Sequence, residues 1–450
     1  MKHYVDIVRH HFLSLCAIAL AWVRDVFFLQ DTLNSWWFED DPAMYFLAAQ
    51  VKHFYQFFFG GRFFRSNEII PMQHVSMWID SQIAYRSTFV AYLHSSLAIL
   101  CASTLIYILM HKICRNRLAA TFVACTWIYL PSTLVTHEFI SARGYIEGLC
   151  FALVAILLAF NLENQSRWRS YPTLFFVGLC TALAFLSKEF YPTTLSVILF
   201  LYAIHKRLWN LACLTVGVGL AYAAYRIHFT GLSFQYGGIK HLDAWGTLKA
   251  YCEIMFIFLG SYTSWFAIGL ALVGVLWSVH ERKIDKWILF YWIAILGSAF
   301  LTIYPVLFAV SVSSQSFGPW FRTMFVIDTL VLMGSVYFLV NYQRKVIQFA
   351  FALAVLLGLS KGSPMLAKNW KILKRSNEVV GRFFLQHQDV YIYDINPAHW
   401  FLPSLANLYE VDPKKHILSD SVPNSKIPCP DCKIVWKYVD GKMIETAWPL

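Results

Sequence analysis

Three consecutive carboxylates follow the first hydrophobic block of this chain, and their position makes them candidates for chemistry. Glu39, Asp40 and Asp41 precede Pro42 at the edge of an apolar segment. Adjacent negative charges oppose one another's ionisation there, and the low-dielectric surroundings add to the cost. An acidic residue before a proline is also typical of a helix N-terminus, where it caps backbone N–H groups. Capping explains one acid and not three, so we predict a functional role for Asp40 or Asp41.

Other charged residues follow or precede later hydrophobic blocks on the same predicted side. Carboxylates and cations that converge there would combine a base with a group that holds an anion. A single charged loop residue is more often simply solvated, so the prediction rests on the pattern. The residues concerned are His137, Glu138, Arg143, Glu147, Lys188, Glu189, Arg226, His228 and Arg322.

The composition indicates a membrane protein. Charged residues make up 14% of the 450 residues, against about 25% in soluble domains, while 58% are apolar and 18% are aromatic. The apolar residues occur in blocks of roughly twenty, which excludes an ordinary soluble enzyme and a disordered, fibrous or coiled-coil protein. The net charge of +11 does not indicate nucleic acid, because the basic residues lie mostly between the blocks.

Eleven hydrophobic blocks must therefore position the charged residues. We predict an all-α polytopic bundle of about eleven transmembrane helices over residues 1–360, with a first outer loop at 31–88. The first block contains Arg24 and Asp25 and lacks a small-residue cleavage site, so it is predicted to be retained. The blocks lie near residues 10–30, 89–110, 118–136, 146–160, 171–187, 191–204, 208–225, 252–279, 287–310, 323–340 and 346–360.

The distribution of basic residues predicts the orientation. With a cytoplasmic amino terminus, the N-terminal tail and five inner loops hold 14 Lys or Arg residues, and four short outer loops hold six. Residues 31–88 and 361–450 are then extracytoplasmic. A cytoplasm-specific reporter that is active after Leu450 would contradict this topology.

Residues 361–450 are predicted to form a small extracytoplasmic α/β domain. Helical stretches at 376–388 and 399–409 alternate with strand-like runs at 390–395 and 416–418, and a hairpin is predicted around Asp440-Gly441. Because the first strand lacks a Gly-rich phosphate loop, we assign no nucleotide to this domain. It is predicted to be a cap or an acceptor-docking domain, and a purely stabilising role fits the sequence equally well.

The sequence favours no cofactor. Cys429 and Cys432 form a CPDC motif that is expected to close a small disulfide loop outside the cytoplasm. Zinc is disfavoured because no second pair of ligands lies nearby. A divalent metal at Glu39 and Asp41 is the remaining alternative, and we predict against it.

Four short patterns carry a resemblance to a known family. They are Asp40-Asp41 with Tyr45, Ala142-Arg143-Gly144-Tyr145, Ser187-Lys188-Glu189, and Arg322 in GPWFRTMF. In these patterns the sequence resembles the GT-C superfamily of integral-membrane glycosyltransferases, which includes protein O-mannosyltransferases and lipid A aminoarabinose transferases. The resemblance covers about residues 1–340. The acidic pair departs from the Asp-Glu common in the mannosyltransferase branch, so neither the sugar nor the acceptor is carried over.

The resemblance implies transfer of a sugar from a polyprenyl-phosphate carrier to a glycan, lipid or protein acceptor, with inversion at the anomeric carbon. Asp40 or Asp41 would be the base. Arg322 would bind the lipid phosphate through its forked guanidinium, with Arg143 and Lys188 as secondary contacts. For Lys188, a side chain extended toward the lipid headgroups is an equally good interpretation. Glu189, Glu138, His137 and Tyr45 complete the predicted substrate site.

Three other classes of protein remain open at this point. A transporter or lipid flippase also has many spans, but the blocks show no repeated halves and the charges gather at one outer edge. A polysaccharide polymerase or ligase uses related substrates but relies on a large late loop, and here the large loop comes first. The third class is a non-catalytic assembly protein. The predicted location is the bacterial inner membrane or the endoplasmic reticulum.

Overall fold

The computed structural model describes most of the chain. The described residues are 2–38, 41–59, 70–163, 165, 167–230, 286–309, 325–342, 345–387, 392–393, 401–410, 417–418, 434–439 and 442–447. Asp40, Arg322, the predicted block at 252–279 and the CPDC motif lie outside these ranges.

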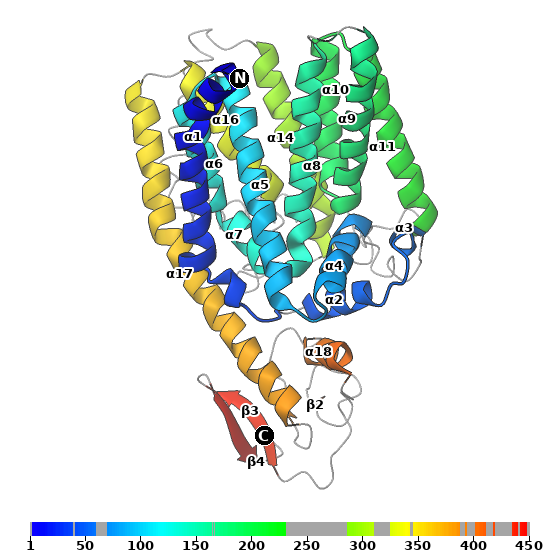
Figure 1. Cartoon of the computed structure of the whole chain (residues 1–450), viewed down its shortest axis with the longest axis vertical. Helices are drawn as coiled ribbons and strands as arrows, with labels where there is room; N and C mark the ends of the chain where they lie inside the picture. Colours follow the sequence, from blue (N-terminus) through cyan, green and yellow to red (C-terminus); the bar gives the residue numbers. More distant parts are fainter. Residues whose placement is uncertain are drawn as a thin grey trace.

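The described chain is dominated by a bundle of long helices that run side by side (Figure 1). Uninterrupted apolar sequence explains them, because a backbone in hydrocarbon must satisfy its hydrogen bonds within its own segment. Ten of the eleven predicted blocks coincide with these helices. The helices are α1 (Lys2–Val23), continued by the π-helix η1 (Arg24–Leu29), α5 (Thr88–Cys114), α6 (Arg117–Ile128), α7 (Pro131–Glu138), α8 (Arg143–Leu162), α9 (Arg167–Ser187), α10 (Tyr191–His205), α11 (Trp209–Thr230), α14 (Lys286–Ala309), α16 (Phe325–Tyr342) and α17 (Lys345–Gln386).

Length and hydropathy qualify part of this bundle as membrane-spanning. Within the described ranges, five helices are long and apolar enough to cross a bilayer, and the bent pair α6 and α7 makes a sixth. The remaining apolar helices of the bundle are shorter. The chain is therefore a multi-pass helical membrane protein, and the number eleven stays a prediction.

The segment predicted as an outer loop at 137–147 is different in the structure. Pro131 restarts the helix after α6 with a bend of 48°, because the residue before a proline is driven into extended backbone. The chain then makes the short 3₁₀ turn η4 (Ile140–Ala142) and enters α8. Residues 137–146 are buried, so this segment is an inner wall of the protein rather than a solvated loop.

The first outer loop folds across one end of the bundle. It contains the 3₁₀ turn η2 (Thr32–Asn34) and the helices α2 (Asp41–Ala49), α3 (Gln56–Phe59) and α4 (Pro71–Ile83). Figure 1 shows α2 and α4 at the end of the bundle opposite the amino terminus. Asp41, the first residue of α2, is thus placed at the rim of the helices.

The C-terminal region extends from the same end. Helix α17 has 42 residues, about 63 Å at ~1.5 Å per residue, and it leaves the bundle without a break at the predicted boundary of 360. The strand order is β2-β1-β3-β4, and the predicted hairpin forms between antiparallel β3 and β4. That these residues form a separate α/β domain stays a prediction. The elements after α17 are β1 (Ile392–Tyr393), α18 (Phe401–Tyr409), β2 (Ile417–Leu418), β3 (Ile434–Val439) and β4 (Lys442–Ala447).

A second hydrophobic core joins these two regions outside the bundle. Trp37 and Tyr45 from the first outer loop pack in one buried cluster with Phe384 of α17 and with Phe401 and Leu405 of α18. Because apolar burial is the main stabilising term, the C-terminal region and the first outer loop form one layer over the end of the bundle.

Candidate active site

Asp41 lies at the start of α2 and is completely buried. Its Oδ1 accepts a hydrogen bond of 2.8 Å from the backbone N–H of Ser141 in η4, 100 positions later in the chain. The carboxylate therefore connects the first outer loop to the segment that precedes α8. This contact lies beyond α2 itself, so Asp41 does more than cap its own helix. Asp40 lies outside the described residues, and the choice between the two acids stays open.

Gln73 of α4 holds the same short segment from the other side. Its Nε2 donates to the carbonyl oxygen of Ser141, whose N–H is bound to Asp41. Gln73 is completely buried. The two side chains thus bind both backbone groups of Ser141 and set the position of the adjoining start of α8.

Gly144 allows α8 to approach its neighbours closely. A Cβ atom at this position would lie 2.5 Å from the carbonyl oxygen of Ser187 and 2.6 Å from Gln73 Oε1. Both distances are shorter than real Cβ contacts. The Ala-Arg-Gly-Tyr pattern of the sequence therefore contains a glycine for steric reasons, and the close approach brings the end of α9 to the Asp41 segment.

We expect Gly144→Ala to destabilise the protein by about 1–3 kcal/mol, because the added methyl group must displace backbone or a buried side chain. Gly217→Ala in α11 is the matched control, since a Cβ there meets no atom within 4 Å. The control is expected to be neutral or to stabilise by up to ~1 kcal/mol. Thermal midpoints in detergent measure both, and equal midpoints would contradict the steric interpretation.

Lys188 brings a cation to this region directly after α9. Its side chain is 9% exposed, and its Nζ lies 5.1 Å from the centre of the Tyr145 ring and 3.6 Å from Glu189 Oε2. Favourable contacts of an ammonium with an aromatic face and a carboxylate hold the charge at a partly desolvated position. The structure therefore favours a buried cation over a lysine that extends freely toward headgroups.

His74 of α4 is buried beside Gln73 and stacks on Phe57, with 6.2 Å between ring centres. Burial, together with the positive charge of Lys188, lowers the pKa of His74 from 6.5 to about 4. The imidazole is therefore neutral at pH 7. We define the outer cluster as Asp41, Gln73, His74, Tyr145 and Lys188.

The lowered pKa of His74 predicts a pH dependence of stability. The unfolded chain binds this proton below about pH 6.5 and the folded chain only below about pH 4, so the free energy of unfolding should fall as the pH drops between these values. The full loss is about 3 kcal/mol. His74→Gln should remove this component, and His53→Gln, at an exposed position, should retain it. Unfolding in detergent from pH 7 to pH 4 is the measurement, and identical slopes for wild type and His74→Gln would refute the assignment.

Arg143 points away from the outer cluster into a buried polar network. Its Nη1 donates to Asp80 Oδ2 at 2.6 Å and to Ser76 at 2.9 Å, its Nε to Ser95 at 3.0 Å, and its Nη2 to the carbonyl oxygen of Ala91 at 2.9 Å. Both Arg143 and Asp80 are almost fully buried. Four protein acceptors thus engage the guanidinium that we predicted to contact a lipid phosphate.

The Arg143 network continues to His94 and Glu147. His94 Nδ1 lies 2.8 Å from Asp80 Oδ1 and 2.9 Å from Arg143 Nη1, and its Nε2 lies 3.4 Å from Glu147 Oε1. A single imidazole nitrogen cannot both donate to the Asp80 carboxylate and accept from the Arg143 guanidinium. We assign the hydrogen bond to the shorter contact, in which Nδ1 donates to Asp80. Asp80 and His94 were not among the site residues predicted from the sequence. Each is an ionisable side chain within or beside an apolar block, and that position could have indicated a buried, paired group.

His137 and Glu138 also belong to buried pairs. His137 lies 3.0 Å from Asp25 through Nδ1 and 2.9 Å from Ser96 through Nε2, which ties η1 to α5 and α7. Glu138 forms an ion pair with Lys374 of α17, and Lys374 also donates to Ser35 at 3.0 Å. These contacts connect helices, and the substrate contacts predicted for His137 and Glu138 stay predictions.

Tyr45 of α2 belongs to the second hydrophobic core. Its ring is 4.9 Å from that of Trp37, and its hydroxyl donates to the carbonyl oxygen of Ala84 at 3.2 Å. Burial raises the pKa of Tyr45, and the negative charge of Asp80 contributes. This tyrosine therefore stays protonated and anchors α2.

Among the predicted site residues, Asp41 binds Ser141 just before α8, and Lys188 lies beside Tyr145 in the first turn of α8 and beside Glu189. Arg143, His137 and Glu138 form buried pairs with Asp80, Asp25 and Lys374, respectively. Arg322 and Asp40 lie outside the described ranges, as does Glu39, the second predicted metal ligand. Within those ranges, no group of three His, Cys, Asp or Glu side chains is placed to hold a metal ion.

No protein-family model and no curated protein matches this chain. Among solved structures it is similar to ArnT from Cupriavidus metallidurans, in a crystal structure bound to undecaprenyl phosphate. The sequence identity is 11%, the TM-score is 0.46, and the alignment covers 98% of each chain.

Proposed function

We propose that this protein is a membrane glycosyltransferase that moves a sugar from a polyprenyl-phosphate carrier to an acceptor hydroxyl at the outer end of the bundle. The observation that carries the proposal is the buried carboxylate of Asp41, bound to Ser141 at the rim of the helices, with the Lys188 cation in the adjoining segments.

In the proposed reaction Asp41 is the base. Its carboxylate takes the proton of the acceptor hydroxyl while the hydroxyl oxygen forms a bond to the anomeric carbon of the sugar. The bond between that carbon and the phosphate oxygen breaks, its electron pair stays on the phosphate, and the anomeric configuration inverts. The N–H of Ser141 orients the carboxylate, which reduces the reorganisation needed at the moment of attack.

Lys188 supports the proposal from the side of the leaving group. Negative charge accumulates on the phosphate as the sugar departs, and a cation in low-dielectric surroundings stabilises it strongly. Lys188 is held against Tyr145 and Glu189, so little side-chain entropy is lost when it binds an anion. Arg322 stays the predicted principal phosphate contact. Arg143 has its donors engaged by protein groups and is left out of this role.

The proposed orientation places this chemistry outside the cytoplasm, in a bacterial inner membrane or the endoplasmic reticulum. The amino terminus is then cytoplasmic, and the first outer loop and residues 361–450 cover the site. The sugar and the acceptor are not specified by the residues of the outer cluster.

The proposal is tested with the full chain in nanodiscs and a polyprenyl-phosphate sugar that is isotopically labelled in the sugar. Undecaprenyl phosphate, bound in the similar ArnT structure, is the first carrier to use. A membrane lipid extract supplies acceptors. We expect free polyprenyl phosphate and labelled acceptor in equal amounts. Movement of the intact donor across sealed vesicles, without cleavage, would show a flippase instead, and an unchanged donor in both assays would refute the proposal.

A further inference from the structure

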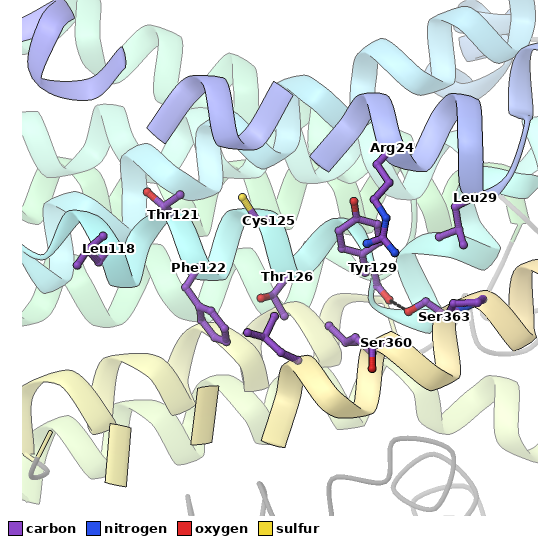
Figure 2. Close-up of a pocket in the computed structure, with 13 residues that line it drawn as sticks. Arg24, Leu29, Leu118, Thr121, Phe122, Cys125, Thr126, Tyr129, Ser360 and Ser363 are labelled. Carbon is purple, nitrogen blue, oxygen red and sulfur yellow. Dashed lines mark hydrogen bonds between the residues drawn. The ribbon is translucent and has the colours of Figure 1, made fainter. Parts of the chain in front are cut away.

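An apolar groove of about 460 Å³ lies on the side of the bundle formed by η1, α6 and α17 (Figure 2). It shares no residue with the outer cluster. The wall from α6 and the wall from α17 are mainly aliphatic and aromatic. The lining residues are Arg24, Leu29, Leu118, Thr121, Phe122, Cys125, Thr126, Tyr129, Leu356, Leu359, Ser360, Ser363 and Pro364.

Arg24 is the one charged residue in this lining. It falls within the candidate span His11–Leu29, it is exposed, and its guanidinium lies 5.2 Å from the centre of the Tyr129 ring. Its neighbour Asp25 faces the opposite way, toward His137 and Gln30. In the described part of the chain, no carboxylate lies within ion-pair distance of Arg24. A cation at this depth is expensive without an anion, so the surroundings must supply one.

The chemistry of the groove selects an anionic headgroup. The hydroxyls of Tyr129, Ser360 and Ser363 donate to backbone carbonyl oxygens of the protein, so the contact with an anion falls to Arg24. The described lining contains no carboxylate that would bind an ammonium headgroup. A phosphate with net negative charge therefore fits better than a zwitterionic head.

The length of the groove fits one leaflet. From Leu118 to Tyr129 the wall of α6 rises by about 16 Å, at ~1.5 Å per residue, which is about half of the ~30 Å hydrocarbon core. An acyl chain that belongs to one leaflet matches this length. A long isoprenoid chain would extend well beyond the groove.

From this juxtaposition we propose that the groove between η1, α6 and α17 is a binding site for an anionic phospholipid of the bilayer. One acyl chain lies along Leu118, Phe122 and Leu356, and the phosphate meets Arg24. The site binds a lipid that is not consumed, so it stands independently of the sugar-transfer proposal. A lipid in this groove would contact both the first span, through η1, and α17, the helix that leads to the C-terminal region.

The test uses the full chain reconstituted in nanodiscs of equal parts phosphatidylglycerol and phosphatidylcholine, followed by extraction into detergent and mass spectrometry of the lipid that stays bound. We expect wild type to retain phosphatidylglycerol preferentially. Arg24→Gln should bind it about fivefold more weakly, the effect of one cation at a phosphate. Arg115→Gln removes an exposed arginine at the end of α5, outside the groove, and should change nothing.

Cys125→Trp provides a second variant, because it fills the middle of the groove and leaves Arg24 in place. It should lower retention while the thermal midpoint shows that the protein is folded. The proposal is overturned if Arg24→Gln and Arg115→Gln lose equal amounts of phosphatidylglycerol, or if wild type retains both lipids equally. It is also overturned if polyprenyl phosphate, added in a third nanodisc preparation, displaces the phospholipid in an Arg24-dependent manner.

Discussion

Asp41→Asn is expected to reduce sugar transfer by about 10²- to 10⁴-fold, the usual cost of losing a general base, while the thermal midpoint stays near that of wild type. The amide oxygen of asparagine can still accept the 2.8 Å hydrogen bond from Ser141 N–H, so the connection between α2 and η4 is kept. The amide cannot take a proton from an acceptor hydroxyl. Activity and stability therefore separate in this variant.

Two further variants complete the experiment. Asp41→Ala removes both the base and the acceptor for Ser141, so it should lose activity and also about 1 kcal/mol of stability. Asp31→Asn, at an exposed aspartate of the same loop, should alter neither quantity. Transfer of labelled sugar and melting temperature are measured on the same preparations.

The outcome of the Asp41→Asn experiment also decides between the two acids. If Asp41→Asn retains near wild-type transfer and Asp40→Asn loses it, Asp40 is the base and Asp41 orients η4. If both variants retain activity, the acidic pair is structural and the proposed mechanism is wrong.

Arg143→Ala is expected to destabilise the protein by about 3–5 kcal/mol, the usual cost of leaving a buried charge without its partner. The group that loses its cation is the carboxylate of Asp80, which is 1% exposed and accepts from Arg143 at 2.6 Å, and the variant leaves it only the contact with His94. The expected effect is on folding, whereas a phosphate ligand would chiefly affect donor affinity. Titration with SDS gives the free energy of unfolding, and donor binding is measured on the folded fraction.

The chain offers a matched control for this ion pair. Arg86 and Glu410 are separated by 2.7 Å, almost the same distance, but their side chains are 28% and 79% exposed. Arg86→Ala should cost less than about 1 kcal/mol, because solvent screens the pair and hydrates the remaining charge. In the Arg143→Ala, Asp80→Asn double variant the loss should be smaller than the sum of the single losses. A stable Arg143→Ala protein with weakened donor binding would instead support the phosphate role.

The sequence by itself determined the class of the protein and most of its helices. A block of about twenty apolar residues is a local property, and in hydrocarbon it leaves a backbone little choice but to become a helix. The Asp440-Gly441 signal that predicted the β3-β4 hairpin is equally local, and so is the signal for the start of a helix at Asp41-Pro42. These predictions needed no knowledge of which helices are neighbours.

Only the tertiary structure decided which partners the buried charges have. The sequence predicted Arg143, His137 and Glu138 as site residues because they carry charge at the predicted rim. Their partners Asp80, Asp25 and Lys374 come from helices that no local pattern brings together. A charge in a low-dielectric interior is stabilised by whichever group the packing places within a few ångströms, and that distance is set by helix arrangement. The sequence could therefore indicate that charges gather at one end of the bundle, and the packing of α4, α8 and α17 decided which partner each of these charges meets.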